Sequence, residues 1–200
     1  MTRQCSWMIG IAGECVYDNT LLTIKNITSL LIRFPCTKIL LDKKIKDLLN
    51  SCKLPNILII SPPGFGKTTL IKAIINYINS FNQDILVIDE RGELFSQTIN
   101  ADFIRFSSKT YAFSKGIRSL SPSVIITDEL ISEEDFDFIS KTINSGISII
   151  ASMHANEEVL NNKDKLLFIN LFDYIIILNN QEIAGEIKYI YDTHNRLKIE

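Results

Sequence analysis

The sequence has 200 residues, 46% of them hydrophobic, and its 21 Lys and Arg residues nearly balance 23 Asp and Glu residues, giving a formal net charge of −2. This composition can bury a sizeable core in one main domain, and the charge balance argues against a general attraction to nucleic acid. No apolar run is long enough to cross a bilayer, and we expect no signal peptide. Four widely spaced cysteines without a C-x-x-C pattern are typical of reduced thiols in a cytosolic protein.

Two elements are predicted ahead of the first Gly- and Pro-rich loop. Residues 8–34, with a turn signal at 18–19 and β-rich runs such as 27–34, indicate a small sheet or hairpin that ends at Pro35. Residues 37–50 carry apolar side chains on one face and lysines elsewhere, which predicts an amphipathic helix. We therefore expect residues 1–36 to form a partial N-terminal β segment and residues 37–200 to form the main domain.

The stretch 56–80 predicts a strand, a tight loop and a helix. Its loop, SPPGFGKT, fits the phosphate-binding pattern G-x-x-x-x-G-K-[ST], except that Ser61 replaces the first Gly. Backbone N–H groups of such a loop surround a phosphate at a helix N-terminus, where the partial positive charge adds to the attraction. Lys67 is expected to reach the β- and γ-phosphate oxygens, and the Thr68 hydroxyl to ligate Mg²⁺.

The rest of the chain alternates strands with helices. Strands are predicted over residues 84–89, 124–127, 147–152 and 173–178, and helices over residues 111–120, 132–144 and 157–171. Residues 98–110 are poorly patterned and are expected to be mostly loop, and residues 183–199 predict a terminal hairpin that turns at 192–195. This alternation predicts an α/β fold with a mostly parallel sheet and helices on both faces.

Polar side chains end four of these strands: the Ser61 loop, Asp89-Glu90, Asp128-Glu129 and His154. Ligands bind at the carboxyl ends of parallel strands, so these groups are expected to meet at one sheet edge. A strand that ends in Asp-Glu is typical of ATPases, in which the Asp holds the Mg²⁺ shell and the Glu polarises the attacking water. We therefore assign Asp128 to the magnesium side and Glu129 as catalytic base. Glu90 and Glu93 are placed near the water or the γ-phosphate, and His154 is either a γ-phosphate sensor or a hydrogen-bonded structural residue.

A guanine nucleotide is an alternative, because residues 89–92 also match the D-x-x-G pattern of GTPases. That interpretation requires a later N-K-x-D, and the nearest candidate, residues 162–165, lacks the final Asp. It would also leave Asp128, Glu129 and His154 without a role. The sequence therefore favours ATP.

Four ordered motifs carry a resemblance to a known family. IISPPGFGKTTLI, VIDERGEL, IRSLSPSVIITDEL and SIIASMHA resemble, in this order, the motifs of the stage III sporulation protein AA family. That family is similar to the hexameric ATPases that drive type II and type IV secretion and pilus retraction. The resemblance covers about residues 10–178 and implies a RecA-like P-loop NTPase that hydrolyses ATP with Mg²⁺.

Site roles follow from this resemblance, residue by residue. It implies a Walker A loop made of Ser61, Pro62, Pro63, Gly64, Phe65, Gly66, Lys67, Thr68 and Thr69. It makes residues 127–129 the end of the Walker B motif. An acidic box and a histidine box of secretion ATPases fall on Asp89, Glu90, Glu93 and His154. Two arginines complete the set: Arg118 matches one that precedes Walker B, and Arg33 lies in a linker from which related hexamers supply arginines to a neighbour's nucleotide.

The resemblance also implies a homo-hexamer that is cytoplasmic and docks at the membrane face onto a membrane-associated sporulation channel protein. Family members carry a longer N-terminal region, so we expect either a truncated start or a reduced member. The predicted function is ATP hydrolysis that powers assembly or transport at a sporulation-associated secretion channel.

Two alternatives belong to other functional classes. An ATP-dependent nucleic-acid remodeller would need a basic groove with stacking aromatics, whereas the aromatic-rich stretch 103–113 carries only Arg105 and Lys109 as strong bases. We therefore expect no nucleic-acid partner. A non-hydrolysing ATP-binding scaffold is the second alternative, and the combined presence of Lys67, Thr68, Asp128 and Glu129 argues against it.

Overall fold

The computed structural model describes residues 8–18, 20–33, 41–95, 99–130, 133–161, 167–179 and 183–199. By its internal contacts the chain divides into two units, Met1–Thr37 and Lys38–Glu200. Each unit is described by itself below.

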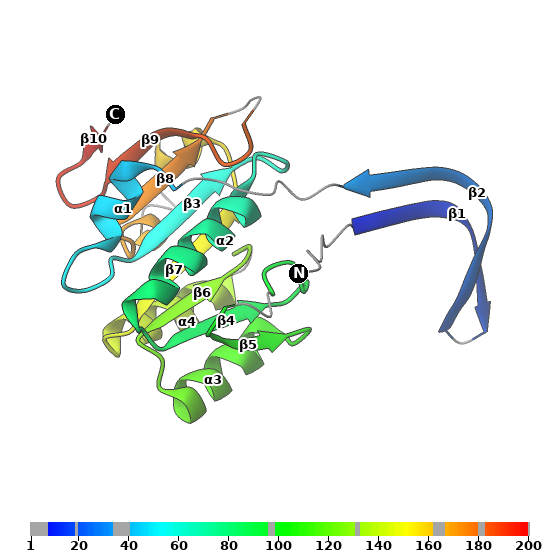
Figure 1. Ribbon diagram of the computed structural model, residues 1–200, viewed down its shortest axis with the longest axis horizontal. Helices are drawn as coiled ribbons and strands as arrows, with labels where there is room; N and C mark the ends of the chain where they lie inside the picture. Colours follow the sequence, from blue (N-terminus) through cyan, green and yellow to red (C-terminus); the bar gives the residue numbers. More distant parts are fainter. Residues whose placement is uncertain are drawn as a thin grey trace. The chain divides into compact units, whose positions relative to one another are not determined.

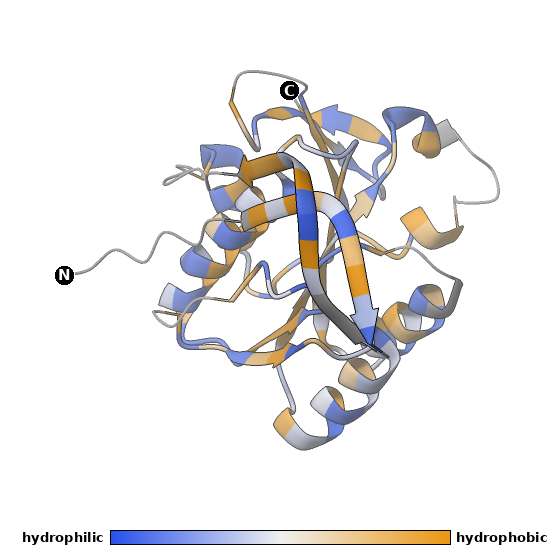
Figure 2. Cartoon of the chain, turned by 90° about the vertical axis from the view of Figure 1, so that its right-hand side faces the viewer, coloured by the Kyte–Doolittle hydropathy of each residue, from blue (hydrophilic) through white to orange (hydrophobic). Residues whose placement is uncertain are grey.

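The first unit contains an antiparallel hairpin of strands β1 (Met8–Asp18) and β2 (Thr20–Arg33). Its register places Ile9 opposite Ile32 and Ile11 opposite Leu30. Directly opposed residues share a face of the sheet, so these four apolar side chains gather on one side, and all of them are exposed. Figure 2 shows hydrophobic and hydrophilic residues interspersed along both strands. The predicted N-terminal hairpin is thus confirmed.

The second unit is built on an eight-stranded sheet with the order β10-β9-β8-β3-β7-β6-β4-β5 (Figure 1). Its parallel strands are β3 (Ile57–Ser61), β4 (Ile85–Asp89), β5 (Asp102–Arg105), β6 (Val124–Thr127), β7 (Ser148–His154) and β8 (Tyr174–Leu178). The antiparallel strands are β9 (Ile187–Asp192) and β10 (Leu197–Ile199), which form the predicted terminal hairpin. The α/β fold with a mostly parallel sheet is confirmed.

Helices cover both faces of this sheet because successive residues of the buried strands point to opposite sides. Ile57 and Ile59 pack in one core cluster with residues of α1 (Lys43–Leu49) and α2 (Lys67–Ile78). Leu58 and Ile60 pack in a second cluster with residues of α3 (Lys109–Leu120) and α4 (Glu133–Asn144). Strand β3 therefore lies inside the core on both faces, and its loop leaves the sheet between β7 and β8.

Three segments differ from the sequence-based expectation. Residues expected to be loop form the edge strand β5, whose first and last residues are exposed. The start of the predicted helix 157–171 is instead the 3-10 helix η2 (Glu157–Asn161), and residues 162–166 lie outside the described part. Helix α1 begins only at Lys43, because the carboxylate of Asp42 accepts the Lys44 N–H and caps the helix there. A second 3-10 helix, η1 (Asn79–Phe81), follows α2 directly.

Candidate active site

The loop between β3 and α2 has the backbone that its glycines predict. Gly64 and Gly66 adopt φ values of 86° and 91°, in the left-handed region that favours glycine. A Cβ on Gly64 would meet nothing within 4 Å, whereas a Cβ on Gly66 would lie 2.3 Å from the backbone nitrogen of Gly185. The segment around Gly185 is hydrogen-bonded to the β3–α2 loop, since the Gly185 N–H donates to the Phe65 carbonyl at 2.8 Å. Gly66 is therefore required both for its φ and for the close approach of a second segment.

Lys67 opens α2 and is 94% buried, at 6% exposure. Its Nζ donates to the carbonyls of Ser61 and Pro62 at 2.8 and 2.9 Å, and lies 2.7 Å from Nδ1 of His154. Burial lowers the pKa of Lys67 to about 8, against the opposing effect of the Glu129 and Asp128 carboxylates. An ammonium group can only donate, so Nδ1 of His154 is the acceptor in this contact.

Strand β7, next to β3, and strand β6, next to β7, bring the histidine and the acidic groups to the same edge. Strand β7 pairs Ser61 with His154, and Asp128 and Glu129 follow directly after β6. Asp128 is buried, and its Oδ1 accepts the Glu129 N–H at 2.8 Å and faces the Ser152 hydroxyl at 3.5 Å. His154 Nε2 lies 3.5 Å from Glu129 Oε1. The predicted lysine, histidine and carboxylates are thus in one continuous set of contacts.

Two cations in this set were not foreseen from the sequence. Arg91 forms an ion pair with Oε2 of Glu129, and Lys109 donates to the backbone carbonyl of Glu129. Lys109 Nζ also lies 3.7 Å from Oε2 of Glu90. Arg91 had one sequence signal, its position just after a strand that ends in Asp89-Glu90 at the same sheet edge. For Lys109 the sequence offered none, because the segment before α3 carries no recognisable pattern.

Asp89 organises the loop that carries Arg91. Its carboxylate is fully buried and accepts the backbone N–H groups of Glu93, Leu94 and Phe95 at 2.8, 2.9 and 3.0 Å. Three such bonds satisfy a buried carboxylate and fold the following residues back over the strand end. Asp89 therefore shapes the loop, while the half-exposed Glu90 faces Lys109.

Of the other predicted residues, Thr68 and Thr69 are at this edge, in the first turn of α2 beside Lys67. Arg118 is not. Arg118 is exposed in the last turn of α3, about 13 Å along the helix axis from Lys109 at 1.5 Å per residue. It is therefore outside the cluster of its own chain. Arg33 ends β2, and its side chain lies outside the described residues, as does the 162–165 segment weighed for guanine recognition.

The donor set fits a magnesium ion held jointly with a nucleotide. The described residues contain no group of three or more His, Cys, Asp or Glu side chains that could hold a metal alone. Mg²⁺ at phosphate sites needs only one or two protein ligands, because phosphate and water supply the rest. Thr68 has no hydrogen-bond partner for its hydroxyl in the described part of the chain, and Asp128 supplies a buried carboxylate. Glu129 Oε2 is also buried, but it is engaged by the guanidinium of Arg91.

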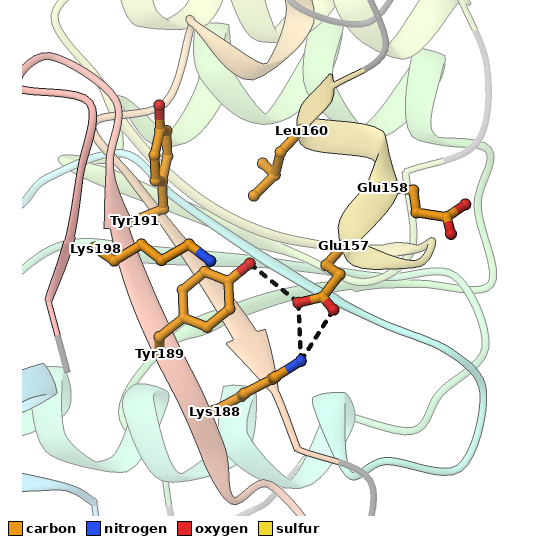
Figure 3. Close-up of a pocket in the computed structure, with 7 residues that line it drawn as sticks. All are labelled: Glu157, Glu158, Leu160, Lys188, Tyr189, Tyr191 and Lys198. Carbon is orange, nitrogen blue, oxygen red and sulfur yellow. Dashed lines mark hydrogen bonds and ion pairs between the residues drawn. The ribbon is translucent and has the colours of Figure 1, made fainter.

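A separate pocket lies beside β9 and β10 and is lined by Glu157, Glu158, Leu160, Lys188, Tyr189, Tyr191 and Lys198 (Figure 3). Glu157 accepts from Lys188 Nζ at 2.9 and 3.0 Å and from the Tyr189 hydroxyl at 3.2 Å. The hydrogen bond from Lys188 lowers the pKa of Glu157, and burial raises the pKa of Tyr189 to about 12. The residues that line this pocket do not include any of the β3–α2 loop, so the pocket is separate from the predicted phosphate site.

The fold is that of RecA-like secretion and pilus ATPases. The crystal structure of the pilus retraction motor PilT with bound ADP matches with a TM-score of 0.63 and 18% identity, over 92% of this chain and 62% of PilT. The VirB11 ATPase from the Brucella suis type IV secretion system matches with a TM-score of 0.59 and 22% identity, over 76% of this chain and 53% of VirB11.

The chain belongs to the family described as sporulation stage III, protein AA, whose profile matches residues 1–197. Stage III sporulation protein AA of Bacillus subtilis (strain 168) is 27% identical over 205 residues, which cover 92% of this chain and 66% of the relative. The chain thus spans just under two thirds of that relative's length. The resemblance predicted from the four motifs is confirmed.

Two further expectations from the sequence concern membrane-spanning segments and the cysteines. No helix among the described residues has the length and apolar character that a bilayer crossing requires. Cys15 and Cys52 are exposed free thiols, and Cys5 and Cys36 lie outside the described ranges.

Proposed function

We propose that this protein is a Mg²⁺-dependent ATPase that powers assembly or transport at a sporulation-associated secretion channel. One observation carries the proposal: a glycine loop leads into buried Lys67 at the sheet edge where Asp128, Glu129 and His154 meet. Membership of the sporulation family and the fold shared with secretion and pilus motors support it.

Phosphate binding uses groups that are already in place. The N–H groups of residues 64–68 at the start of α2 supply donors and a partial positive charge to the β-phosphate. Lys67, now held by two carbonyls and His154, extends to the β- and γ-phosphate oxygens. Thr68 and Asp128 would hold Mg²⁺, which supplies neutralising charge to the phosphate oxygens when bound.

In the proposed hydrolysis, Glu129 is the proton acceptor. The oxygen of a water molecule attacks the γ-phosphorus, and the bond from that phosphorus to the β–γ bridging oxygen breaks. ADP leaves with the bridging oxygen, and Glu129 takes the proton of the water. His154, hydrogen-bonded to Lys67 and close to Glu129, links the phosphate lysine to the base.

The motor role also requires neighbours and a partner. We infer a homo-oligomer, with Arg33 or Arg118 reaching the nucleotide of an adjacent copy, because Arg118 does not reach the site of its own chain. The partner is a membrane-associated channel protein that the chain meets at the cytoplasmic face. Both inferences rest on the family and the fold.

Nucleotide binding with two variants tests the proposal. Lys67→Ala removes the phosphate cation and should abolish detectable binding of a fluorescent ADP in the presence of Mg²⁺. Glu129→Gln keeps the loop and should bind ADP and ATP as the wild type does, but lose turnover. Normal turnover by Glu129→Gln would show that another group, with Glu90 next in line, acts as base. Binding by Lys67→Ala equal to wild type would place the nucleotide elsewhere.

A further inference from the structure

The ion pair between Arg91 and Glu129 points to a role that the proposed hydrolysis has not used. We propose that Arg91 recognises the γ-phosphate within its own chain, and that its guanidinium moves from Glu129 to the phosphate when ATP binds. This inference rests on the proposed function, since it concerns the same nucleotide. It assigns to this chain a residue that distinguishes ATP from ADP.

The position of Arg91 follows from a line of contacts that starts at the phosphate lysine. Lys67 Nζ lies 2.7 Å from His154 Nδ1, and His154 Nε2 lies 3.5 Å from Glu129 Oε1. The second oxygen of Glu129 meets Arg91. A lysine at this point of a phosphate loop contacts the β- and γ-phosphates. Arg91 is therefore linked to the phosphate lysine through His154 and the proposed base, and it lies next to the carboxylate that would face the attacking water.

The chemistry of the Arg91 guanidinium favours its move from the Glu129 carboxylate to the γ-phosphate. A guanidinium presents a planar fork of N–H donors that matches phosphate oxygens in pairs, and a terminal phosphate carries more charge than one carboxylate. The Arg91 side chain is 54% exposed, so it can turn without leaving a buried site. A turn encloses Arg91, because the Asp89 carbonyl accepts the Gly92 N–H at 3.3 Å, and Gly92 has a φ of 72° in this turn.

The exchange also prepares the base. Oε2 of Glu129 is buried, and among the described residues the guanidinium of Arg91 is the one partner recorded for it. When the guanidinium turns to the γ-phosphate, this oxygen becomes able to accept a hydrogen bond from the attacking water. ADP has no γ-phosphate, so with ADP bound the ion pair stays. Arg91 thus couples the presence of ATP to the release of Glu129.

Binding of two nucleotides to matched arginine variants tests this role. The full chain carries Arg91→Gln, Arg91→Lys or the control Arg105→Gln, and calorimetry measures Mg²⁺-dependent binding of ADP and of the non-hydrolysable analogue AMP-PNP. Arg105 is a suitable control because it pairs in register with Asp89, near the site, while its guanidinium stacks 3.9 Å over the Phe95 ring.

Loss of a charged hydrogen bond predicts that Arg91→Gln weakens AMP-PNP binding by about 10- to 100-fold and ADP binding by less than about threefold. Arg91→Lys should recover part of the AMP-PNP affinity, and Arg105→Gln should leave both affinities at the wild-type value. An equal loss for both nucleotides would overturn the proposal and make Arg91 a structural residue of the loop. Unchanged affinities with reduced turnover would also overturn it, because Arg91 would then only position Glu129. Failure of the proposed function is distinct, because it shows in the wild type itself, which would then bind neither nucleotide or would bind ATP without hydrolysing it.

Discussion

Substitution of Gly66 by Ala tests the packing of the phosphate loop against the turn at Gly185. The structure gives two separate costs. An L-residue at a φ of 91° is strained, by about 1–2 kcal/mol, as in any left-handed position. The new methyl group would also lie 2.3 Å from Gly185 N and 2.6 Å from the Ala184 carbonyl carbon, where backbone must move. Forced displacement in packed regions adds about 1–3 kcal/mol, so the total is about 2–5 kcal/mol of unfolding free energy.

Gly146 offers a matched control, because it separates strain from collision. Its φ is 86°, nearly that of Gly66, but a Cβ there would meet nothing within 4 Å. Gly146→Ala should therefore cost only the strain, about 1–2 kcal/mol.

Urea unfolding followed by far-ultraviolet circular dichroism gives both free energies under the same conditions. We expect Gly66→Ala to lose about 1–3 kcal/mol more than Gly146→Ala. Equal losses would refute the reasoning, because they would mean that Ala184 and Gly185 do not lie against the loop.

Three further predictions concern charge. Because phosphate binding needs the charged form of Lys67 and burial holds its pKa at about 8, nucleotide affinity should be constant below that pH and fall by up to about tenfold per unit above it. Calorimetry in buffers of different ionisation enthalpy should detect proton uptake on binding at pH 9, and constant affinity to pH 10 would contradict the assignment. Asp89→Asn should lower the free energy of unfolding by about 2–4 kcal/mol, because an amide replaces the buried carboxylate that accepts three N–H groups. The control Asp102→Asn, at an exposed position of β5, should stay within about 0.5 kcal/mol of the wild type in the same urea titration. A single-stranded DNA filter assay should show no retention at 0.15 M salt, and retention that weakens as salt rises would favour the nucleic-acid remodeller instead.

The central strands were predictable because burial on both faces leaves a short, continuous apolar run. Residues 84–89 and 124–127 have this character, and they form β4 and β6 within a residue of the expected bounds. Strand β5 was missed because an edge strand is only half-buried, so its exposed ends interrupt the apolar pattern. Residues 157–161 were expected to be α-helical, since hydrophobic spacing does not distinguish an α-helix from one 3-10 turn.

In the candidate site, sequence reasoning could place the residues that directly end a strand. Lys67, Asp128, Glu129 and His154 meet because strands β3, β6 and β7 are parallel neighbours in the sheet. The contact of Arg91 with Glu129 depends instead on the path of a loop, which Asp89 folds through three backbone hydrogen bonds. Such a path leaves no periodic signal in the sequence.

Phosphate release from ATP, measured per chain over a range of protein concentrations with Mg²⁺, tests the central claim most directly. Glu129→Gln is the blank, because it keeps the fold and the phosphate loop but removes the proposed base. The account predicts turnover above this blank that rises per chain with concentration, as expected when neighbouring copies complete the site. ATP binding with no phosphate release by the wild type or by Glu129→Gln at any concentration would contradict the account and identify a non-hydrolysing scaffold.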